Sequence, residues 1–506
     1  MIEVEVHSSL RAFLREQGQP NWPHHLTMAR LVARALRLGR SALIQTGSPQ
    51  EPYRLSYLAP ALIWQEPVII VAPVLVQTWL LQVEIPSLQE WMGTNKPIHV
   101  GDRFPDEDFQ GLLITTPEAW LADRLGEKRA FPQGIPTLID QADDLEDWVR
   151  DQLKSTIQPQ HWHGLMLAHP QKADWIRDRW VRLTKRLFER PANPYDCYLI
   201  ESGEQAVIQE LFEVLQSANG GESAYLPPAW KQFWQCWQSS NQFTWAGIER
   251  SQGQFSLYCE PTEVATSLSP IWSEQPIVLI GGALDLDTAA SVYRQQLGLG
   301  ELTCLKFSPD RHSKLIQLYL PDRLPMPNTP RFRNALFQQV RTLLGASHQV
   351  KTPVVILVGD VPLKNQLGAV LAAEFGSRVQ VEKTQLEENG ILVCGWEFWR
   401  SQQQFLPSPQ LLIIATLPLP SLEYPWVAGQ VAYYKQRRLD WFRLYLLPAA
   451  LRELQRAVAP VRDSQGIVAL LDNRVNHRSY GTQVLSALSP FAQINYVDDG
   501  WFEILG

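Results

Sequence analysis

Closely spaced cysteines are missing from this sequence of 506 residues. The five that occur are Cys197, Cys236, Cys259, Cys304 and Cys394. Because no C-x-x-C pair is present, we expect neither a zinc site nor an iron–sulfur site, and we expect reduced thiols. His161, His163 and His169 have no cysteine or carboxylate beside them, so we interpret them as surface imidazoles. We therefore expect no metal site.

Two further absences concern membranes and nucleic acids. Met1–Val6 has neither a basic segment nor an apolar core, and no apolar run reaches the roughly 18 residues that span a bilayer. The formal net charge is −7 and the pI is near 5.9, so the chain as a whole does not attract nucleic acid. We expect a cytoplasmic protein without a membrane contact, in which any nucleic-acid binding uses a local patch.

What is present indicates an ordered α/β protein. Apolar residues make up 45% and charged residues 19%, and the length predicts about three domains. Short buried runs rich in Val, Ile and Leu alternate with helical patterns, which is typical of parallel sheets. From about Trp148 to Glu260 the pattern changes to amphipathic helices rich in Trp, Gln and Arg. The strands that we expect are Ser41–Ile44, Pro67–Pro73, Pro97–Val100, Gly111–Thr115, Ile135–Asp140, Pro276–Gly282, Thr352–Val358, Gly390–Cys394, Gln410–Ala415 and Gly466–Leu471.

The segment Gly47–Arg54 has the length and the setting of a phosphate-binding loop, with a strand before it and a helix after it. Such a loop reads G-x-x-x-x-G-K-[ST], but its last three positions here hold Pro52, Tyr53 and Arg54. Pro52 has no N–H to offer a phosphate. Tyr53 is neutral where lysine would pair with phosphate, and Arg54 would repel the Mg²⁺ that a hydroxyl would bind. The loop, including Gly47 and Ser48, therefore predicts a vestigial nucleotide site.

Several further motifs occur in the order of one known family. The chain resembles the DinG/XPD group of superfamily 2 DNA helicases nearly from end to end. The strand end Leu138–Asp147 is similar to V-I-D-E-A-H-N-L-E-D, and Leu470–Arg474 followed by Ser479–Gly481 is similar to L-D-N-R…Y-G. The other segments that resemble family motifs are Val76–Leu80 with Glu84–Glu90, Ile280–Leu284, Glu397–Ser401 and Leu417–Pro420.

This resemblance implies two RecA-like domains of the P-loop type, the first interrupted by a helical, arch-like insertion. We assign residues 1–147 and 262–285 to the first domain, 148–261 to the insertion, and 286–506 to the second domain. The resemblance also implies an iron–sulfur cluster in some members, held by four cysteines before the D-E-A-H position. Residues 55–140 contain no cysteine, so we expect no cluster.

The same alignment places substitutions at each catalytic role. Asp140 is retained and could assist Mg²⁺, but Gln141 stands at the catalytic glutamate, and an amide does not take a proton from water. Asp143 stands at a coupling histidine, and Ala459 stands at the arginine finger, with Arg456 nearby. The adenine-proximal glutamine position falls at His25. Because base, lysine, hydroxyl and finger are all replaced, we predict loss of ATP hydrolysis and expect no cofactor.

Two basic segments are candidates for nucleic-acid binding. Arg179, Arg182 and Arg186 share one face of a predicted helix beside aromatic residues, and Arg437 and Arg438 belong to a second cluster with Lys435 and Arg443. The alternative for both is an ordinary solvated surface, which an acidic chain favours.

Three functions remain open. The first is a non-catalytic binder of single-stranded or branched nucleic acid, or a regulatory subunit, in DNA repair, replication or defence. The second is a protein-interaction scaffold that uses the Trp-rich helices. The third is an active ATP-dependent helicase with atypical motifs, for example with Arg54 reaching phosphate.

Overall fold

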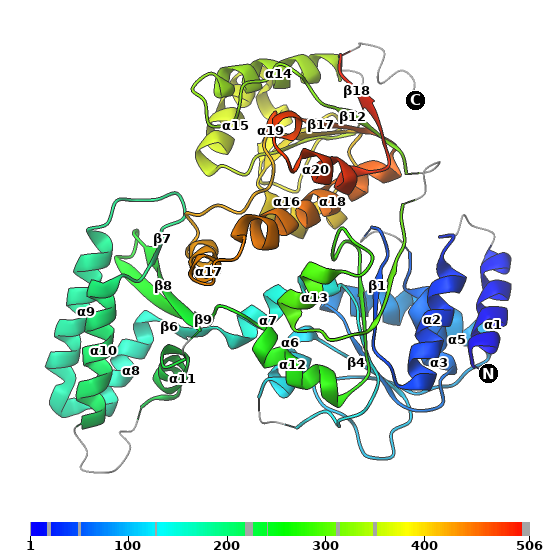
Figure 1. The fold of residues 1–506 in the computed structure, drawn as a ribbon, viewed down its shortest axis with the longest axis horizontal. Helices are drawn as coiled ribbons and strands as arrows, with labels where there is room; N and C mark the ends of the chain where they lie inside the picture. The colour runs from blue at the N-terminus through cyan, green and yellow to red at the C-terminus, as the bar shows by residue number, and fades with distance from the viewer. Residues whose placement is uncertain are drawn as a thin grey trace.

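The computed structural model describes residues 2–17, 22–48, 52–126, 129–217, 226–239, 241–309, 314–347 and 352–497. Three units are arranged around a common centre (Figure 1). We call them the first sheet unit, the insertion and the second sheet unit, and each contains one β-sheet. Residues 49–51 of the expected phosphate loop lie outside the described residues.

The first sheet has seven parallel strands in the order β11-β1-β10-β5-β2-β4-β3. All six strands expected before residue 285 are present, and their runs of Val, Ile and Leu are buried except in the edge strand β3. The strands are β1 (Ala42–Gln45), β2 (Val68–Val71), β3 (Ile98–Val100), β4 (Leu112–Thr115), β5 (Thr137–Ile139), β10 (Ile277–Gly281) and β11 (Thr303–Lys306).

The expected end of the first domain at residue 285 was too early. Strand β11 pairs with β1, so the first sheet unit extends to at least Lys306. The four residues of β11 mix polar and apolar side chains, so no buried apolar run marks this strand in the sequence.

Helices cover both faces of the first sheet, and each face carries a separate apolar core. The core that contains Ile44, Ile70 and Ile280 packs under α1, α2, α3 and α5. The core that contains Leu43, Ile69 and Leu279 packs under α6, α7, α12 and α13. The helical segments of this unit are α1 (Ile2–Gln17), α2 (His25–Leu38), α3 (Leu55–Ile63), α4 (Val74–Trp79), η1 (Leu80–Glu84), α5 (Ile85–Met92), α6 (Pro117–Arg124), η2 (Ala142–Asp144), α7 (Leu145–Leu153), α12 (Ala265–Glu274) and α13 (Ser291–Leu297).

The second sheet also has seven parallel strands, in the order β14-β15-β13-β16-β17-β12-β18. All four expected strands of this half are present. The strands are β12 (Ile316–Tyr319), β13 (Val354–Leu357), β14 (Val379–Val381), β15 (Ile391–Cys394), β16 (Leu411–Ile414), β17 (Ile467–Leu470) and β18 (Phe491–Ile494).

The helices of the second sheet unit again form two layers. Apolar residues of α14 and α15 bury one face of the sheet, and those of α16, α18 and α20 bury the other. The helical segments are α14 (Phe332–Ala346), α15 (Val361–Phe375), η4 (Gly376–Arg378), α16 (Trp396–Gln402), η5 (Gln403–Phe405), α17 (Pro425–Gln436), η6 (Phe442–Leu446), α18 (Leu447–Asp463), α19 (Arg474–His477) and α20 (Gly481–Leu488).

The helical insertion also contains a sheet, which we did not expect. The insertion combines helices with an antiparallel sheet of order β6-β9-β8-β7, whose long hairpin β8–β9 alternates buried and less buried residues. Trp and Tyr on the less buried face hid this alternation from the sequence pattern. The elements are β6 (Ser155–Ile157), α8 (Pro159–Ala168), η3 (Pro170–Lys172), α9 (Ala173–Phe188), β7 (Cys197–Leu199), α10 (Ser202–Ser217), α11 (Pro228–Trp237), β8 (Gln242–Glu249) and β9 (Gln254–Pro261).

The insertion contacts the second sheet unit through α17, which lies between the two in Figure 1. The Tyr195 ring lies 3.8 Å from that of Tyr424, and Gln430 donates a hydrogen bond to the carbonyl of Thr262. A Cβ at Gly429 would lie 2.8 Å from the Phe243 ring, so only glycine allows α17 to approach this closely. The insertion is therefore attached to both sheet units.

In the part of the chain that the structure describes, no helix combines the length and apolarity of a membrane span. The cytoplasmic location stays a prediction.

Candidate functional site

The loop that resembles a phosphate-binding loop begins where β1 ends, beside the end of β10. The N–H groups of Thr46 and Gly47 donate to the carbonyls of Gly281 and Gly282, at 2.8 and 3.0 Å. Gly47 has φ +87°, and a Cβ there would lie 2.7 Å from the carbonyl oxygen of Phe307. Gly47 is thus required by the chain packing around it, and its N–H is already used.

Asp140 follows β5, on the same edge of the sheet, and its carboxylate is surrounded by donors. Oδ1 accepts hydrogen bonds from the Tyr53 hydroxyl at 2.5 Å and the Gln141 N–H at 2.8 Å. Oδ2 accepts from the Tyr57 hydroxyl at 2.9 Å and from Arg54 Nε at 3.0 Å. An ionised carboxylate offers about four lone-pair sites, and all of them are occupied here. The side chain is 1% exposed.

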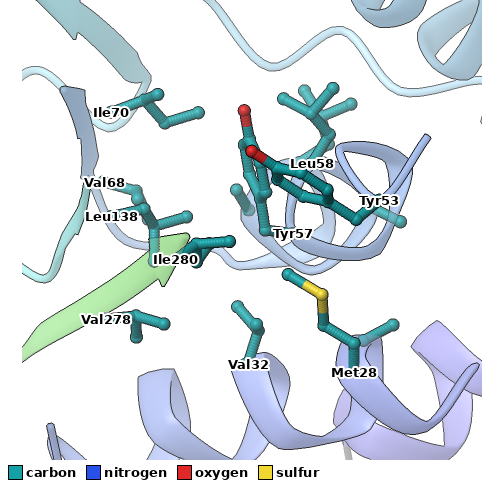
Figure 2. Close-up of a cluster of buried hydrophobic side chains, with 14 of the residues drawn as sticks. Met28, Val32, Tyr53, Tyr57, Leu58, Val68, Ile70, Leu138, Val278 and Ile280 are labelled. Atoms are coloured by element: carbon teal, nitrogen blue, oxygen red, sulfur yellow. The ribbon is translucent and has the colours of Figure 1, made fainter. Parts of the chain in front are cut away.

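The two tyrosines fill the space between α3 and the sheet. Figure 2 shows both rings among Met28, Val32 and Ile280, with their hydroxyl oxygens at the same end of the cluster. Burial raises the pKa of both phenols well above the usual value, and the negative charge of Asp140 raises it further. Both remain neutral donors to Asp140. Tyr53 stands at the lysine position of the loop, so apolar packing replaces a cation there.

Arg54 is held by the same carboxylate. Burial alone would lower the pKa of its guanidinium, but the neighbouring Asp140 outweighs it and the pKa is raised overall. The side chain is 18% exposed and its Nε is bonded to Asp140. In this conformation Arg54 serves as the counter-charge of Asp140.

Glu84, at the end of η1, is a second carboxyl group near this centre. Its Oε1 accepts a hydrogen bond from Trp79 Nε1 at 3.2 Å, while Oε2 is buried without a hydrogen-bond partner. Burial raises the pKa of Glu84 to about 7, against the opposing effects of Arg54 and Trp79. Glu84 therefore changes its charge near neutral pH.

The residues after Asp140 have structural contacts. Gln141 takes a left-handed conformation with φ +57°. Both carboxylate oxygens of Asp143 accept backbone N–H bonds, from Gly282 at 2.7 Å and Ala283 at 2.8 Å. Asp143 thus joins this turn to the end of β10, at the place where the resemblance implied a coupling histidine.

His25, expected near an adenine, is directed into the protein. It is 2% exposed, and its Nδ1 lies 2.8 Å from the Ser56 hydroxyl. Burial lowers the pKa of His25 to about 4, so the ring is neutral at physiological pH. Its contacts are those of a core histidine that connects α2 to α3.

The last motif lies on α18 of the second sheet unit. Ala459 is 2% exposed and has no group that could reach a phosphate. Arg462 donates to the carbonyls of Leu488 and Ser489, at 2.6 and 3.1 Å. Arg456 reaches the first sheet unit, where its Nη1 lies 2.9 Å from Oδ1 of Asp144.

Arg456 belongs to a group of ion pairs between the two sheet units. Arg400 lies 3.4 Å from Asp147, and Arg452 lies 3.9 Å from Glu146. Burial would raise the pKa of Glu146, but Arg150 and Arg452 outweigh it and the pKa is lowered overall. Three acidic residues of η2 and α7 thus face three arginines of α16 and α18. We call this group the inter-unit ion pairs.

The candidate nucleic-acid residues of the insertion are in part engaged with acidic neighbours. Arg179 contacts Asp178 at 2.6 Å and Glu210 at 2.8 Å, and its guanidinium lies over the Trp175 ring. Arg186 packs against Gly203, and Arg182 is exposed. The three do not form one free basic face, because Glu210 neutralises Arg179.

The second basic cluster is more accessible. Arg437 lies over the Tyr433 ring and 3.4 Å from Glu263, while Arg438, in a left-handed conformation, is exposed. This cluster follows α17, next to the contact between the insertion and the second sheet unit. Its role in nucleic-acid binding stays a prediction.

The described residues of this loop edge leave few groups available to Mg²⁺ or to a nucleotide phosphate. The acceptor sites of Asp140 are filled, the N–H groups of Thr46 and Gly47 are donated, and Pro52 has none. Within the described ranges, no group of three or more His, Cys, Asp or Glu side chains could hold a metal ion.

Comparisons with known proteins agree with the fold. No protein-family model matches the chain. Over 257 residues, 48% of this chain and 40% of the relative, it is 23% identical to the ATP-dependent DNA helicase YoaA of Escherichia coli K12. It is also 23% identical, over 248 residues, to YoaA of Haemophilus influenzae. The matched region thus spans about two fifths of the length of these curated relatives.

Solved structures match over almost the whole chain. An XPD helicase superposes with a TM-score of 0.62 at 11% identity and covers 94% of this chain and 100% of its own. This is a DinG/XPD-like helicase fold. The S. tokodaii Xpd4 structure, with a TM-score of 0.59, 11% identity and the same coverage, has it too. The resemblance drawn from the motifs is therefore confirmed at the level of the fold.

Three features of the helicase-fold site were missed by sequence reasoning. Tyr57 carried a usable signal, because it lies on the predicted helix only four residues after Tyr53, close enough for both side chains to reach the same centre. The partners of Arg456 and the environment of Glu84 carried none, because they depend on contacts between distant segments.

Proposed function

We propose that this DinG/XPD-like protein keeps the helicase architecture without hydrolysing ATP, as a non-catalytic nucleic-acid-binding or regulatory component. The observation that carries the proposal is the filled carboxylate of Asp140, which accepts four hydrogen bonds from its own chain. A Mg²⁺ ion takes oxygen ligands at short, near-octahedral distances. Asp140 would have to give up at least one of these bonds to become such a ligand.

That exchange is unfavourable in this environment. Tyr53 and Tyr57 are almost fully buried, so a hydroxyl released from Asp140 would be left without water. An unsatisfied buried donor costs on the order of 1–3 kcal/mol, and the freed Arg54 would place a positive charge beside the metal. The replacements at Gln141 and Ala459 remove the base and the finger as well, which supports loss of the whole reaction rather than slower turnover.

The inter-unit ion pairs support a role that does not depend on nucleotide. In enzymes of this fold class the two sheet units need a signal from bound nucleotide to come together. Here Arg456, at the finger motif, binds Asp144 of the other unit directly, at 2.9 Å. Side chains of this chain thus contribute to the orientation of the sheet units.

For the partner, we infer nucleic acid first. The curated relatives are named ATP-dependent DNA helicases, and the exposed Arg438 follows α17, the helix that contacts the insertion. Single-stranded or branched DNA is the expected ligand. A protein-interaction scaffold without nucleic-acid binding is the second candidate, supported by the pairing of Arg179 with Glu210.

The deciding experiment measures phosphate release from ATP·Mg²⁺ by the purified full chain, with and without single-stranded DNA. We expect no release above background and no rise of the melting temperature with ATP. Phosphate release stimulated by DNA would overturn the proposal and identify an active helicase with atypical motifs.

DNA binding is measured on the same sample by fluorescence anisotropy over a range of salt concentrations. Binding that weakens as salt rises supports the nucleic-acid role, because phosphate contacts release counterions. No binding at low salt would reject that role and leave the scaffold. The matched variants are the Arg437→Ala/Arg438→Ala double variant and a control, Arg331→Ala/Arg333→Ala, which removes two arginines on a distant surface.

A further inference from the structure

The helix pair α1–α2 has a local excess of arginine in a chain that is acidic as a whole. Residues 1–40 contain six arginines and no lysine, while the formal net charge of the protein is −7. Four of these arginines, Arg11, Arg15, Arg30 and Arg34, are exposed on the two helices. The helix pair lies at the end of the molecule opposite the insertion (Figure 1). We call these four residues the arginine patch.

The arginine patch belongs to one surface of the helix pair. Each helix supplies two of its residues, four positions apart, and residues at that spacing share a helix face. The ion pair of Arg37 with Glu3, at 2.6 Å, joins the end of α2 to the start of α1, so the two helices run antiparallel. Arg30 precedes Arg37 by seven residues and Arg11 follows Glu3 by eight. At the same rise per residue, the two pairs of arginines are therefore at the same level of the helix pair.

Acidic neighbours do not neutralise the arginine patch. Within the described ranges, none of its four guanidinium groups forms an ion pair or a hydrogen bond, unlike Arg179, which is paired with Glu210. The Glu16 carboxylate accepts a hydrogen bond from Trp91 Nε1 of α5, at 2.5 Å. Glu5 lies six residues before the nearest patch residue and thus on another side of α1. Because salt screens charges beyond about 8 Å at physiological ionic strength, acidic residues elsewhere on the chain act weakly here.

We propose that the arginine patch binds the phosphate backbone of double-stranded DNA. A guanidinium group is planar and always charged, and it binds phosphate oxygens through two parallel hydrogen bonds. A duplex carries one negative charge about every 1.7 Å of its axis, and arginines one helical turn apart are separated by about 6 Å, so several phosphates come within reach of the patch. This inference adds a second surface to the proposed function, which places single-stranded DNA near α17, and it rests on the nucleic-acid role proposed there.

The surroundings of the arginine patch favour a duplex over other polyanions. Proteins that bind single strands stack the bases on aromatic side chains, and none of the exposed residues of α1 and α2 is aromatic. A protein partner is held mainly by large side chains in the centre of an interface, whereas Ser8 and Ala12 are the exposed residues next to Arg11 on α1. The large apolar residues exposed on these helices, Val4 and Leu38, lie at the end of the pair near Arg37.

The test measures binding of the purified full chain to a short fluorescent DNA duplex by anisotropy. Each phosphate contact contributes about −0.9 to the slope of log affinity against log salt, so four contacts predict a loss of affinity of about 150-fold between 50 and 200 mM salt. Arg30→Ala/Arg34→Ala keeps two contacts, so its loss over the same range should be about 12-fold. Arg11→Ala/Arg15→Ala should give the same result from the other helix. The control Arg331→Ala/Arg333→Ala removes the same charge from a distant exposed surface and should behave as the wild type.

The proposal is rejected if the wild type does not bind the duplex. It is also rejected if both patch variants keep the salt dependence of the wild type, because the patch is then only a solvated surface. Binding of poly-L-glutamate without binding of the duplex rejects it in favour of an acidic protein partner. Circular dichroism of each variant checks that the fold is retained.

A single strand of the same sequence separates this inference from the proposed function. If the single strand binds and the duplex does not, the arginine patch is rejected and the proposed function stands. If the duplex binds and both patch variants weaken it, while the single strand does not bind, the patch is supported and the proposed single-strand role is rejected.

Discussion

Removing the Tyr53 hydroxyl tests most directly whether its hydrogen bond to the Asp140 carboxylate stabilises the fold and excludes a metal. Tyr53→Phe removes one donor from Asp140 and leaves the ring, which is 1% exposed, in place. The three other bonds to Asp140 remain. The variant therefore changes one hydrogen bond to a buried charge and little else.

We expect this change to lower the free energy of unfolding by about 2 kcal/mol, because hydrogen bonds to charged groups contribute about 1.5–3 kcal/mol. The matched control is Tyr293→Phe. Tyr293 is also 1% exposed, and its hydroxyl donates at 2.6 Å to a neutral acceptor, the carbonyl of Ala142. A neutral bond contributes about 1 kcal/mol, so the control should cost about half as much.

The measurement is urea denaturation, monitored by amide hydrogen exchange in the first sheet unit. This readout is needed because the chain has several domains, so a single unfolding midpoint does not describe their separate stabilities. A double-mutant cycle with Asp140→Asn isolates the coupling between Tyr53 and Asp140. If Tyr53→Phe is neutral, or costs no more than Tyr293→Phe, the reasoning fails. If the variant gains Mg²⁺-dependent binding of ATP, then one hydroxyl was all that excluded the metal, and the proposed loss of the site is wrong.

Two further predictions concern charge. Burial raises the pKa of Glu84 from its usual value of 4.5 to about 7, so the folded chain holds a proton between these values that the unfolded chain has lost. The free energy of unfolding should therefore fall as pH rises from about 4.5 to about 7. Glu84→Gln should be more stable than the wild type by about 3 kcal/mol at pH 8 and equal to it at pH 4, as measured by denaturation at both pH values. Equal stability of the two proteins at pH 8 would contradict the buried position of Glu84. Arg456→Ala removes the 2.9 Å ion pair with Asp144, so small-angle scattering should show a broader range of orientations of the sheet units at physiological salt. The control Arg331→Ala, on the exposed surface, should leave the scattering profile unchanged. An unchanged profile in Arg456→Ala would mean that other contacts set the orientation.

Much of the fold follows from local patterns in the sequence. Runs such as Val68–Val71 and Leu411–Ile414 are buried on both faces of a parallel sheet, so their composition identifies them directly. The hairpin β8–β9 was missed because Trp245 and Tyr258 stack on its less buried face and obscure the alternation of period two. Strand β11 was missed because its four residues mix polar and apolar side chains, and its pairing with β1 identifies it as a strand.

The sequence predicts which catalytic residues of the candidate site are replaced, but it does not predict the contacts of the replacing residues. The residue types alone show that Pro52 has no N–H to donate and that the amide of Gln141 cannot act as a base. That Tyr57 and Arg54 both bind Asp140 depends on how α3 packs against β5, more than 80 residues away along the chain. The partner of Arg456 lies 312 residues away, in a different unit. Such pairings are set by tertiary structure, which no local pattern encodes.

Gly429 has a mechanical consequence. Gly429 lets α17 approach Phe243, so the second sheet unit contacts the insertion. The inter-unit ion pairs already connect the two sheet units, and the chain itself connects the insertion to the first sheet unit. Two units with a single contact can rotate relative to each other, but when each of three units contacts the other two, none can rotate without straining the remaining contacts. A larger side chain at position 429 would separate α17 from the insertion and allow the insertion to rotate relative to the second sheet unit.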